Sequence, residues 1–272
     1  MGSINLLKFN KKMEMKMKNT HLIIVSLLFV TLNVFAAGNL IHHYTFDGQN
    51  GDDSVGTLNP SFQGSVTYSS NAKYGSYALE LDGTAPAYID YPTTDFGNQF
   101  SIASWVYLVE YHNIATVISD REFAGGTQDG FQLFLNNHWE NRDGAIIFNT
   151  ANGSVGINNV TPNNTVPSGT WAQVVVTVDR GAGTMDMYLN GAKRTDLNSN
   201  ACRTDFRNNF AWTIGNCDNH DPGNAYEGLI DDVRIYDGIL SDAEVLALYN
   251  IPEPATLLIM SSFIFAFLLR RK

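Results

Sequence analysis

The sequence predicts an all-β domain built from two packed antiparallel sheets, a sandwich or jelly roll. Short segments rich in Val, Ile, Tyr, Phe and Trp recur from Leu40 to Tyr236, and each ends near Gly, Pro, Asn or Asp. No stretch before residue 241 shows helical periodicity over ten residues. The roughly 214 residues between positions 37 and 250 are enough to bury a core without cross-links.

The first half of the domain consists of short apolar segments separated by polar turns. A loop rich in Gly, Asp, Asn and Ser follows the first segment, at residues 49–60. Asp-Gly pairs end the first two segments, and Pro92 ends the third. The strands expected here are Leu40–Phe46, Tyr74–Asp82, Tyr88–Tyr91, Phe100–Val109, Ala115–Ser119, Phe131–Leu135 and Ala145–Phe148.

The second half contains the most apolar strand. Trp171–Asp179 includes four valines, as expected for a strand that is covered on both faces. Thr184–Leu189 is its expected partner, and Asn190-Gly191 then predicts a two-residue hairpin turn, because both central positions of such a turn take positive φ. The remaining expected strands are Ala211–Gly215 and Gly228–Tyr236.

One short helix is expected to end the folded domain. Ser241 and Glu244 match the spacing of a capping box, in which each residue satisfies a backbone N–H at the start of a helix. The apolar residues that follow predict a helix over residues 241–249.

Both ends of the chain differ in composition from the domain. Five lysines precede the apolar run Leu22–Phe35, and small residues follow it, which predicts a signal peptide over residues 1–36 cut after Ala36; a membrane anchor is the alternative. A second apolar run, Ala255–Leu269, is followed by three basic residues and predicts a C-terminal transmembrane helix with its basic end in the cytoplasm.

The domain is strongly acidic, so nucleic acid is not an expected partner. Residues 37–250 contain nine Lys and Arg against 25 Asp and Glu, a net charge of about −16. The only cysteines, Cys202 and Cys217, are expected to form a disulfide in an exported protein, with two buried thiols as the alternative.

Six segments in order resemble one known family. They are His43–Gly48, Tyr74–Gly83, Phe100–Val106, Trp171–Asp179, Met187–Gly191 and Gly228–Tyr249. Together they resemble the laminin-G-like jelly-roll domain of the concanavalin A-like lectin/glucanase superfamily, and the resemblance covers residues 37–250. It implies an antiparallel two-sheet jelly roll with one concave sheet.

The C-terminal segment, residues 251–272, has its own resemblance. Pro252, Glu253 and Pro254, the apolar run and the basic end are similar to a PEP-CTERM sorting signal of Gram-negative-type bacteria. This resemblance implies an exosortase-type sorting enzyme as a partner, attachment to the membrane through this segment, and a location at the cell surface or in the extracellular matrix. A plain tail anchor is the alternative.

The sequence lacks the acid pattern of a glucanase. Related glucanases carry Glu-x-Asp-x-x-Glu on one strand face, whereas here Glu80 and Asp82 are followed by Ala85 at the third position. There is no Gly-x-Ser-x-Gly and no His-x-x-x-His. We therefore predict that the protein is not an enzyme, with a divergent glycosidase or polysaccharide lyase as the alternative.

The resemblance also implies a structural Ca²⁺ ion that joins the first strands to the last. Carried onto this chain, its ligands are Asp231, Asp47 and the carbonyl oxygen of Gly83. The alternative is that these acids accept hydrogen bonds from backbone amides.

A carbohydrate or glycoprotein ligand is the predicted partner of the concave face. Trp139 lies among polar residues, and with Asn137, His138 and Arg142 it forms the predicted ligand contact; the loop 218–226 is a second candidate. Trp105, Trp171 and Trp212 lie in strand patterns and are expected in the core. We thus predict an exported, non-catalytic binding or adhesion module, with a purely structural matrix protein as a further alternative.

Overall fold

The computed structural model describes residues 38–251 except 85–86, 111–113, 123–127, 137–139 and 218–221. The predicted signal peptide and the C-terminal sorting segment from Pro252 onward lie outside the described residues. Among the helices that are described, none has the length and apolar character needed to cross a bilayer.

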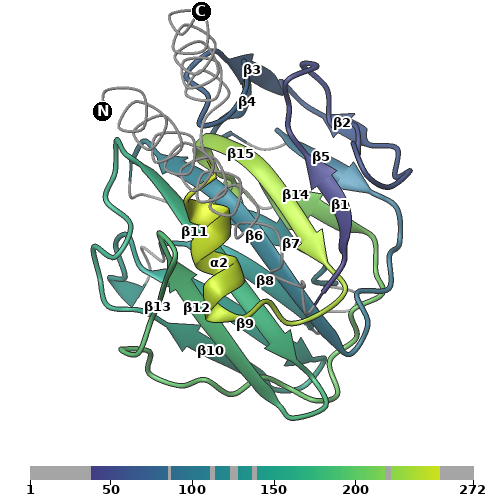
Figure 1. The fold of residues 1–272 in the computed structure, drawn as a ribbon, viewed down its shortest axis with the longest axis vertical. Coiled ribbons are helices and arrows are strands. Elements are labelled where there is room, and N and C mark those ends of the chain that lie inside the picture. Colours follow the sequence, from purple (N-terminus) through teal and green to yellow (C-terminus); the bar gives the residue numbers. More distant parts are fainter. Residues whose placement is uncertain are drawn as a thin grey trace, which may run out of the picture. The chain divides into compact units, whose positions relative to one another are not determined.

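Two antiparallel sheets form the domain (Figure 1), as the sequence predicts. Sheet A has the order β13-β12-β11-β6-β15-β4-β3, and β1 also pairs with β15. Its strands are β1 (Leu40–Tyr44), β3 (Thr67–Ser69), β4 (Ala78–Asp82), β6 (Gln99–Leu108), β11 (Trp171–Asp179), β12 (Thr184–Leu189), β13 (Ala192–Lys193) and β15 (Glu227–Tyr236).

Sheet B has the order β10-β9-β8-β7-β14-β5-β2. Its strands are β2 (Ser61–Gln63), β5 (Tyr88–Tyr91), β7 (Ala115–Ser119), β8 (Asp129–Leu135), β9 (Ile146–Asn152), β10 (Gly156–Val160) and β14 (Trp212–Ile214), and a short 3₁₀ helix, η3 (Pro222–Asn224), precedes β15.

The core lies between the two sheets, because alternate side chains of each strand point inward. Trp212 is fully buried at its centre, where its ring stacks on Tyr91 at 4.2 Å and meets Tyr44 and Phe96 at edge-on angles. The core prediction is confirmed for Trp212. It is wrong for Trp171, which is half-buried beside Tyr107 on the outer face of sheet A.

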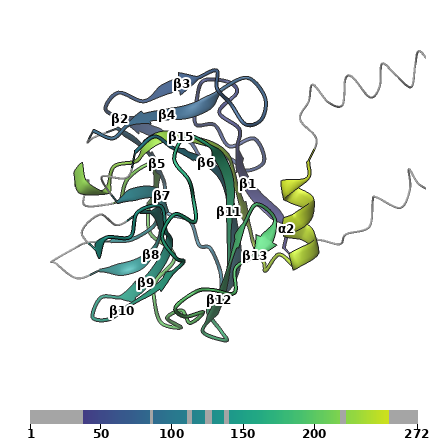
Figure 2. The ribbon, with the colours of Figure 1, turned by 90° about the vertical axis from the view of Figure 1, so that its left-hand side faces the viewer.

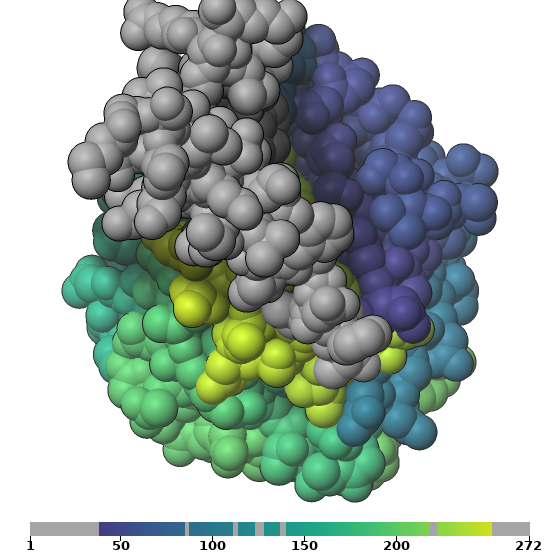
Figure 3. Space-filling model, in the orientation of Figure 1, coloured from purple at the N-terminus to yellow at the C-terminus, as the bar shows by residue number. Residues whose placement is uncertain are grey.

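The outer face of sheet A is covered in part by α2 (Asp242–Tyr249), which lies across it in Figure 2 and is seen in yellow in Figure 3. Val245 packs against Val175 and Tyr188. Trp105 is buried here rather than between the sheets, and its ring stacks on Tyr249 at 5.6 Å. The strand β11 is therefore buried on both faces: one faces sheet B, and on the other Val175 packs against α2.

Two local predictions are confirmed by backbone geometry. Asn190 and Gly191 have φ of 50° and 79° between β12 and β13, as a two-residue hairpin requires. Ser241 caps α2 with the reciprocal hydrogen bonds of a capping box to Glu244.

Several predicted strand bounds differ from the structure; β9, for example, ends at Asn152, four residues beyond the predicted end at Phe148. Residues 74–77 are not part of β4, because their backbone N–H groups are held by aspartates instead of a neighbouring strand. The strands β2, β3, β10 and β13 were not predicted; they are two to five residues long and rich in Ser, Gly, Asn or Lys, which have low strand propensity.

We expect Gly228→Ala to lower the free energy of unfolding by roughly 3 kcal/mol or more. Gly228 has φ of 139°, and an added Cβ would overlap the carbonyl oxygen of Tyr107 on β6. The control is Gly97→Ala, which also has positive φ but meets no atom closer than 3.8 Å and should cost only about 1 kcal/mol. Urea denaturation of both variants measures the difference, and equal losses would contradict the packing argument.

Candidate functional site

A polar groove lies on the outer face of sheet B, the left-hand side of Figure 2, which α2 does not cover. Its volume is about 540 Å³, within the range of small-molecule sites. Half of its lining residues are carboxamides. The lining residues are Ile114, Arg121, Gln128, Gln132, Phe134, Glu140, Asn149, Gly156, Asn158 and Asn224.

Three of these carboxamides stand in one row across three strands. Gln132 on β8 pairs with Asn149 on β9, and Asn149 pairs with Asn158 on β10. Directly paired residues of antiparallel strands point to the same face of a sheet, and the neighbours Phe131 and Leu133 point into the core. The row therefore presents its amides outward, one per strand.

The rows on either side of the amides are chemically different. One row is apolar and consists of Phe134, Ile147 and Val160. The other has small side chains and consists of Gly130, Ala151 and Gly156. The outer side of sheet B thus has an apolar row, an amide row and a row of small residues side by side, and the apolar row is almost fully buried.

Arg121 brings a cation to the groove and is held in place by the first amide. Its Nη1 donates to Gln132 Oε1 at 3.0 Å, and Gln132 Nε2 donates to Thr116 Oγ1 at 2.8 Å. Burial lowers the pKa of Arg121 to about 10, so the side chain is still charged at neutral pH.

The two remaining amides of the row bind each other. Asn149 Nδ2 donates to Asn158 Oδ1 at 2.6 Å and to the carbonyl oxygen of Ile157 at 3.4 Å. Asn149 Oδ1 is buried and has no hydrogen-bond partner in the structure. Asn158 is exposed.

The predicted ligand loop lies beside this groove, but only part of it is described. Arg142 forms an ion pair with Glu140 at 2.6 Å, and Glu140 lines the groove. The predicted contacts Asn137, His138 and Trp139 lie outside the described residues. The second predicted loop, 218–226, contributes Asn224 to the groove.

The sequence reasoning missed the strand residues Gln132, Asn149, Asn158 and Gly156. A signal for Gln132 exists, because it is a lone polar residue inside an apolar strand pattern. Asn158 and Gly156 gave no such signal, since β10 itself was not predicted.

The acid pair Asp231–Asp232 lies at a bulge in β15. Asp231 is fully buried; its Oδ2 accepts from the backbone N–H groups of Lys73 and Tyr74 at 2.8 and 2.9 Å. Burial raises the pKa of Asp231 to about 7, although these N–H groups act in the opposite direction. Asp232, with φ of 51°, binds His43 Nε2 on β1 at 2.7 Å. The two acids thus bind different segments: Asp231 binds the segment that precedes β4, and Asp232 binds β1.

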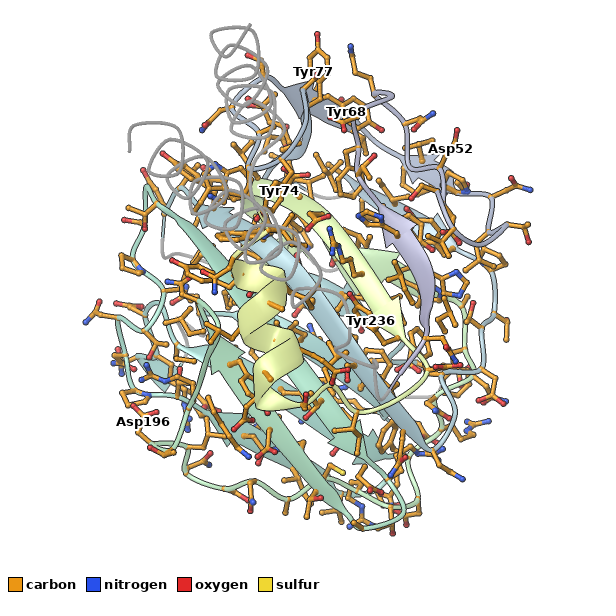
Figure 4. The ribbon with its side chains drawn as sticks, viewed as in Figure 1. Asp52, Tyr68, Tyr74, Tyr77, Asp196 and Tyr236 are labelled. Atoms are coloured by element: carbon orange, nitrogen blue, oxygen red, sulfur yellow. The ribbon has the colours of Figure 1, made fainter. Side chains whose placement is uncertain are left out.

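Asp231 also supports the contact at the end of the described chain. Tyr74, whose N–H it accepts, donates its hydroxyl to the carbonyl oxygen of Ile251 at 3.0 Å and packs edge-on against Trp105. Tyr74 is seen near the upper end of α2 in Figure 4. Lys73 Nζ lies 4.5 Å from the Trp105 ring centre, within cation–π range.

The three predicted calcium ligands do not form one group. Asp47 Oδ1 accepts from the N–H groups of Ser76 and Tyr77, so both acids bind the segment 73–77. The register of β4 and β15 places Gly83 about five residues, or roughly 16 Å, along the strand from the level of Asp231. Among the described residues no cluster of three His, Cys, Asp or Glu side chains fits a metal ion.

The predicted disulfide is wrong: the structure holds Cys202 and Cys217 as buried thiols. Cys202 Sγ lies 3.4 Å from the carbonyl oxygen of Thr184, in sheet A, whereas Cys217 follows β14 in sheet B. Burial raises the pKa of Cys202 to about 11, which disfavours the reactive thiolate.

The acids closest to a glucanase pattern are not in the groove. Glu80 and Asp82 are exposed on β4, in sheet A, and accept hydrogen bonds from Thr67 and Thr84. They therefore lie in the sheet opposite to the groove.

Residues 82–246 match the family model described as the concanavalin A-like lectin/glucanases superfamily. The chain belongs to this superfamily. No curated protein matches the chain.

Several solved structures share the fold. Domain 4 of AbnA, a GH43 extracellular arabinanase from Geobacillus stearothermophilus, in complex with arabinotriose, has a TM-score of 0.59 at 24% identity and matches 79% of this chain and 100% of that domain. The botulinum neurotoxin type G receptor binding domain has a TM-score of 0.58 at 17% identity over 78% of this chain. The binding domain of Paraclostridial Mosquitocidal Protein 1 has a TM-score of 0.58 at 18% identity over the same share. The chain spans about half the length of these two toxin domains, 51% and 52%.

Calcium binding, predicted for Asp231, Asp47 and the carbonyl of Gly83, stays a prediction. We expect the melting temperature of the purified protein to be higher in millimolar Ca²⁺ than in EDTA, because an ion bound only to the folded state stabilises it. The difference should disappear in Asp47→Asn, whose carboxylate is the exposed one of the pair. Equal melting temperatures of the parent protein in Ca²⁺ and in EDTA would contradict calcium binding.

Asp120, at the end of β7, should make the fold less stable as pH rises. It is 1% exposed, and burial raises its pKa well above the ordinary value; a nearby Asp129 adds to this. A carboxyl with a raised folded-state pKa contributes most below its unfolded pKa, about 3.9, and its contribution is lost as pH rises toward the folded value. Asp120→Asn keeps the acceptor for the N–H of Phe131 and should reduce this loss. Urea denaturation at pH 5 and pH 8 measures it, and equal pH dependence in both proteins would contradict the assignment.

Proposed function

We propose that this protein is a non-catalytic carbohydrate-binding module whose ligand is a neutral glycan held in the groove of sheet B. The observation that carries this proposal is the row Gln132, Asn149 and Asn158, which places three carboxamides in the lining of one groove beside an apolar row. Each carboxamide has both donors and acceptors, as a sugar hydroxyl does.

The composition of the groove favours a sugar over other ligands. Phe134, the member of the apolar row that lines the groove, suits the C–H face of a sugar ring, while the amide row suits its hydroxyls. The whole domain carries about −16 charges, which disfavours polyanionic ligands. A neutral glycan meets both conditions.

The comparisons are consistent with binding. The arabinanase domain is described in complex with arabinotriose, and the toxin domains are described as binding domains. Because the identities are below 25%, these structures show a shared fold, and the ligand class is our proposal.

The alternative of a glycosidase has less support in the groove. Hydrolysis of this kind uses two carboxyl groups across the scissile bond. Among the described residues that line the groove, Glu140 is the one carboxylate, and Arg142 neutralises it. A binding module needs no such pair.

We also propose export to the cell surface or extracellular matrix. The proposal is supported by the signal-peptide pattern of residues 1–36 and by the likeness of residues 251–272 to a PEP-CTERM signal, which implies sorting by an exosortase-type enzyme. A glycan-binding module in that compartment would act in adhesion or matrix attachment.

A glycan array of neutral and acidic polysaccharides tests the function. We expect binding to neutral glycans, with little dependence on salt, and no release of reducing ends during incubation. Gln132→Ala, which removes the support of Arg121, should weaken binding at least tenfold, or about 1.4 kcal/mol. The matched control is Asn71→Ala, an exposed amide beside sheet A that is outside the groove.

Three outcomes of that experiment would overturn the proposal. Absence of binding to every glycan would favour a purely structural matrix protein. Release of reducing ends would favour a glycosidase. Equal weakening by Gln132→Ala and Asn71→Ala would place the binding site outside the groove.

A further inference from the structure

Asn149 stands out in the groove because its hydrogen-bonding capacity is only half used. It is 4% exposed, and its Nδ2 is bound by Asn158 and by the backbone. Its Oδ1 is buried and accepts no hydrogen bond. An acceptor left in this state costs about 1–3 kcal/mol, so its presence at the floor of a groove points to a ligand that supplies the donor.

The neighbouring amides show that this capacity is concentrated at one place. Gln132 uses its Oε1 for Arg121 and its Nε2 for Thr116. Asn158 uses its Oδ1 for Asn149 and lies exposed on the edge strand β10, and its Nδ2 donates to no acceptor among the described residues. In the pair of asparagines, the open groups are therefore the acceptor Oδ1 of Asn149 and the two N–H donors of the Asn158 amide.

The carbonyl oxygen of Ile157 determines which way the Asn149 amide is turned. If this amide rotated by half a turn, its oxygen would face the Ile157 oxygen, and the hydrogen bond of 3.4 Å between Asn149 Nδ2 and that carbonyl would be lost. The pair, which we call the asparagine dyad, is fixed by the register of β9 and β10.

Gly156 leaves space beside the dyad. It lies on β10 two residues before Asn158 and lines the groove. Its φ is not positive, so the backbone does not require glycine there. A Cβ at this position would lie 3.2 Å from Asn149 Nδ2, and a larger side chain would occupy the space beside the dyad.

We propose that the asparagine dyad is the specificity-determining contact of the groove and reads two adjacent hydroxyls of a neutral sugar, one donating to Asn149 and the other accepting from Asn158. The ligand class is a glycan whose internal units keep a vicinal diol. This inference rests on the proposed carbohydrate function and adds to it the part of the sugar that is recognised.

Two glucans of the same sugar test the dyad in the purified full-length protein. A long glucan linked through O4 keeps adjacent hydroxyls at its second and third carbons, whereas a long glucan linked through O3 has no vicinal diol in its internal units. We expect titration to show at least tenfold tighter binding of the O4-linked chain. Periodate, which cleaves vicinal diols, should abolish the binding of that chain.

Three variants separate the dyad from the fold. Asn149→Leu keeps the size of the side chain and removes both polar groups, and it should erase the preference for the O4-linked glucan. Asn158→Ala should weaken the binding of the O4-linked glucan. Gly156→Val replaces glycine on an edge strand with a residue of higher strand propensity, so the melting temperature should be kept or raised while binding is lost. Asn71→Ala serves again as the control.

The results distinguish this inference from the proposed function. If neither glucan nor any other glycan binds, the carbohydrate function and the dyad both fall. If the protein binds glycans but Asn149→Leu retains the parent preference, or if both glucans bind equally, the function stands and the dyad is wrong. Binding retained by folded Gly156→Val would also overturn the dyad.

Discussion

The acid pair in β15 is the interaction on which the arrangement of sheet A depends. One edge of β15 pairs first with β4, at residues 227–230, and then with β1, at residues 233–236. The bulge at Asp231 and Asp232 fills the interval between these two partners. Asp231 accepts hydrogen bonds from the backbone N–H groups of the segment that leads into β4, and Asp232 binds His43 of β1. Both β1 and the start of β4 are thereby held against β15.

Backbone hydrogen bonds explain why the carboxylate of Asp231 can be buried at the bulge. Asp231 accepts three backbone N–H groups, from Lys73, Tyr74 and Asp232, which offset part of the cost of removing its charge from water. The contact continues from Tyr74 to Ile251, where the described chain ends. A side chain at the centre of the sheet thereby supports both the start of β4 and the end of the domain.

The sequence predicted the fold well because its signals are local. Alternation and turn residues placed β5, β7, β11 and β12 at their observed bounds, and the capping box placed α2. The errors arose where contacts between residues distant in the sequence determine the local structure. Residues 74–77 have strand composition but are held by Asp47 and Asp231, and the two cysteines fit an exported pair in spacing but belong to different sheets.

The candidate site was predicted only at its margin. Loop composition pointed to Arg142 and to the loop of Asn224, which lie at or beside the groove. Its floor depends on register: Gln132, Asn149 and Asn158 are separated in the sequence by up to 26 positions, and only strand pairing aligns them. No pattern within one strand reveals such a row, and low strand propensity concealed β10.

The outer faces of the two sheets differ in the side chains that they carry, and this difference decides which face α2 covers. The outer face of sheet A carries Ala103, Val175 and Tyr188, and this apolar surface is buried by α2. The outer face of sheet B carries a row of amides beside the apolar row of Phe134, Ile147 and Val160. Asn158, on the edge strand β10, is exposed to water, whereas Gln132 and Asn149 are buried and form side-chain hydrogen bonds within the protein. The proposed binding face is therefore the one on which the fold places these amides.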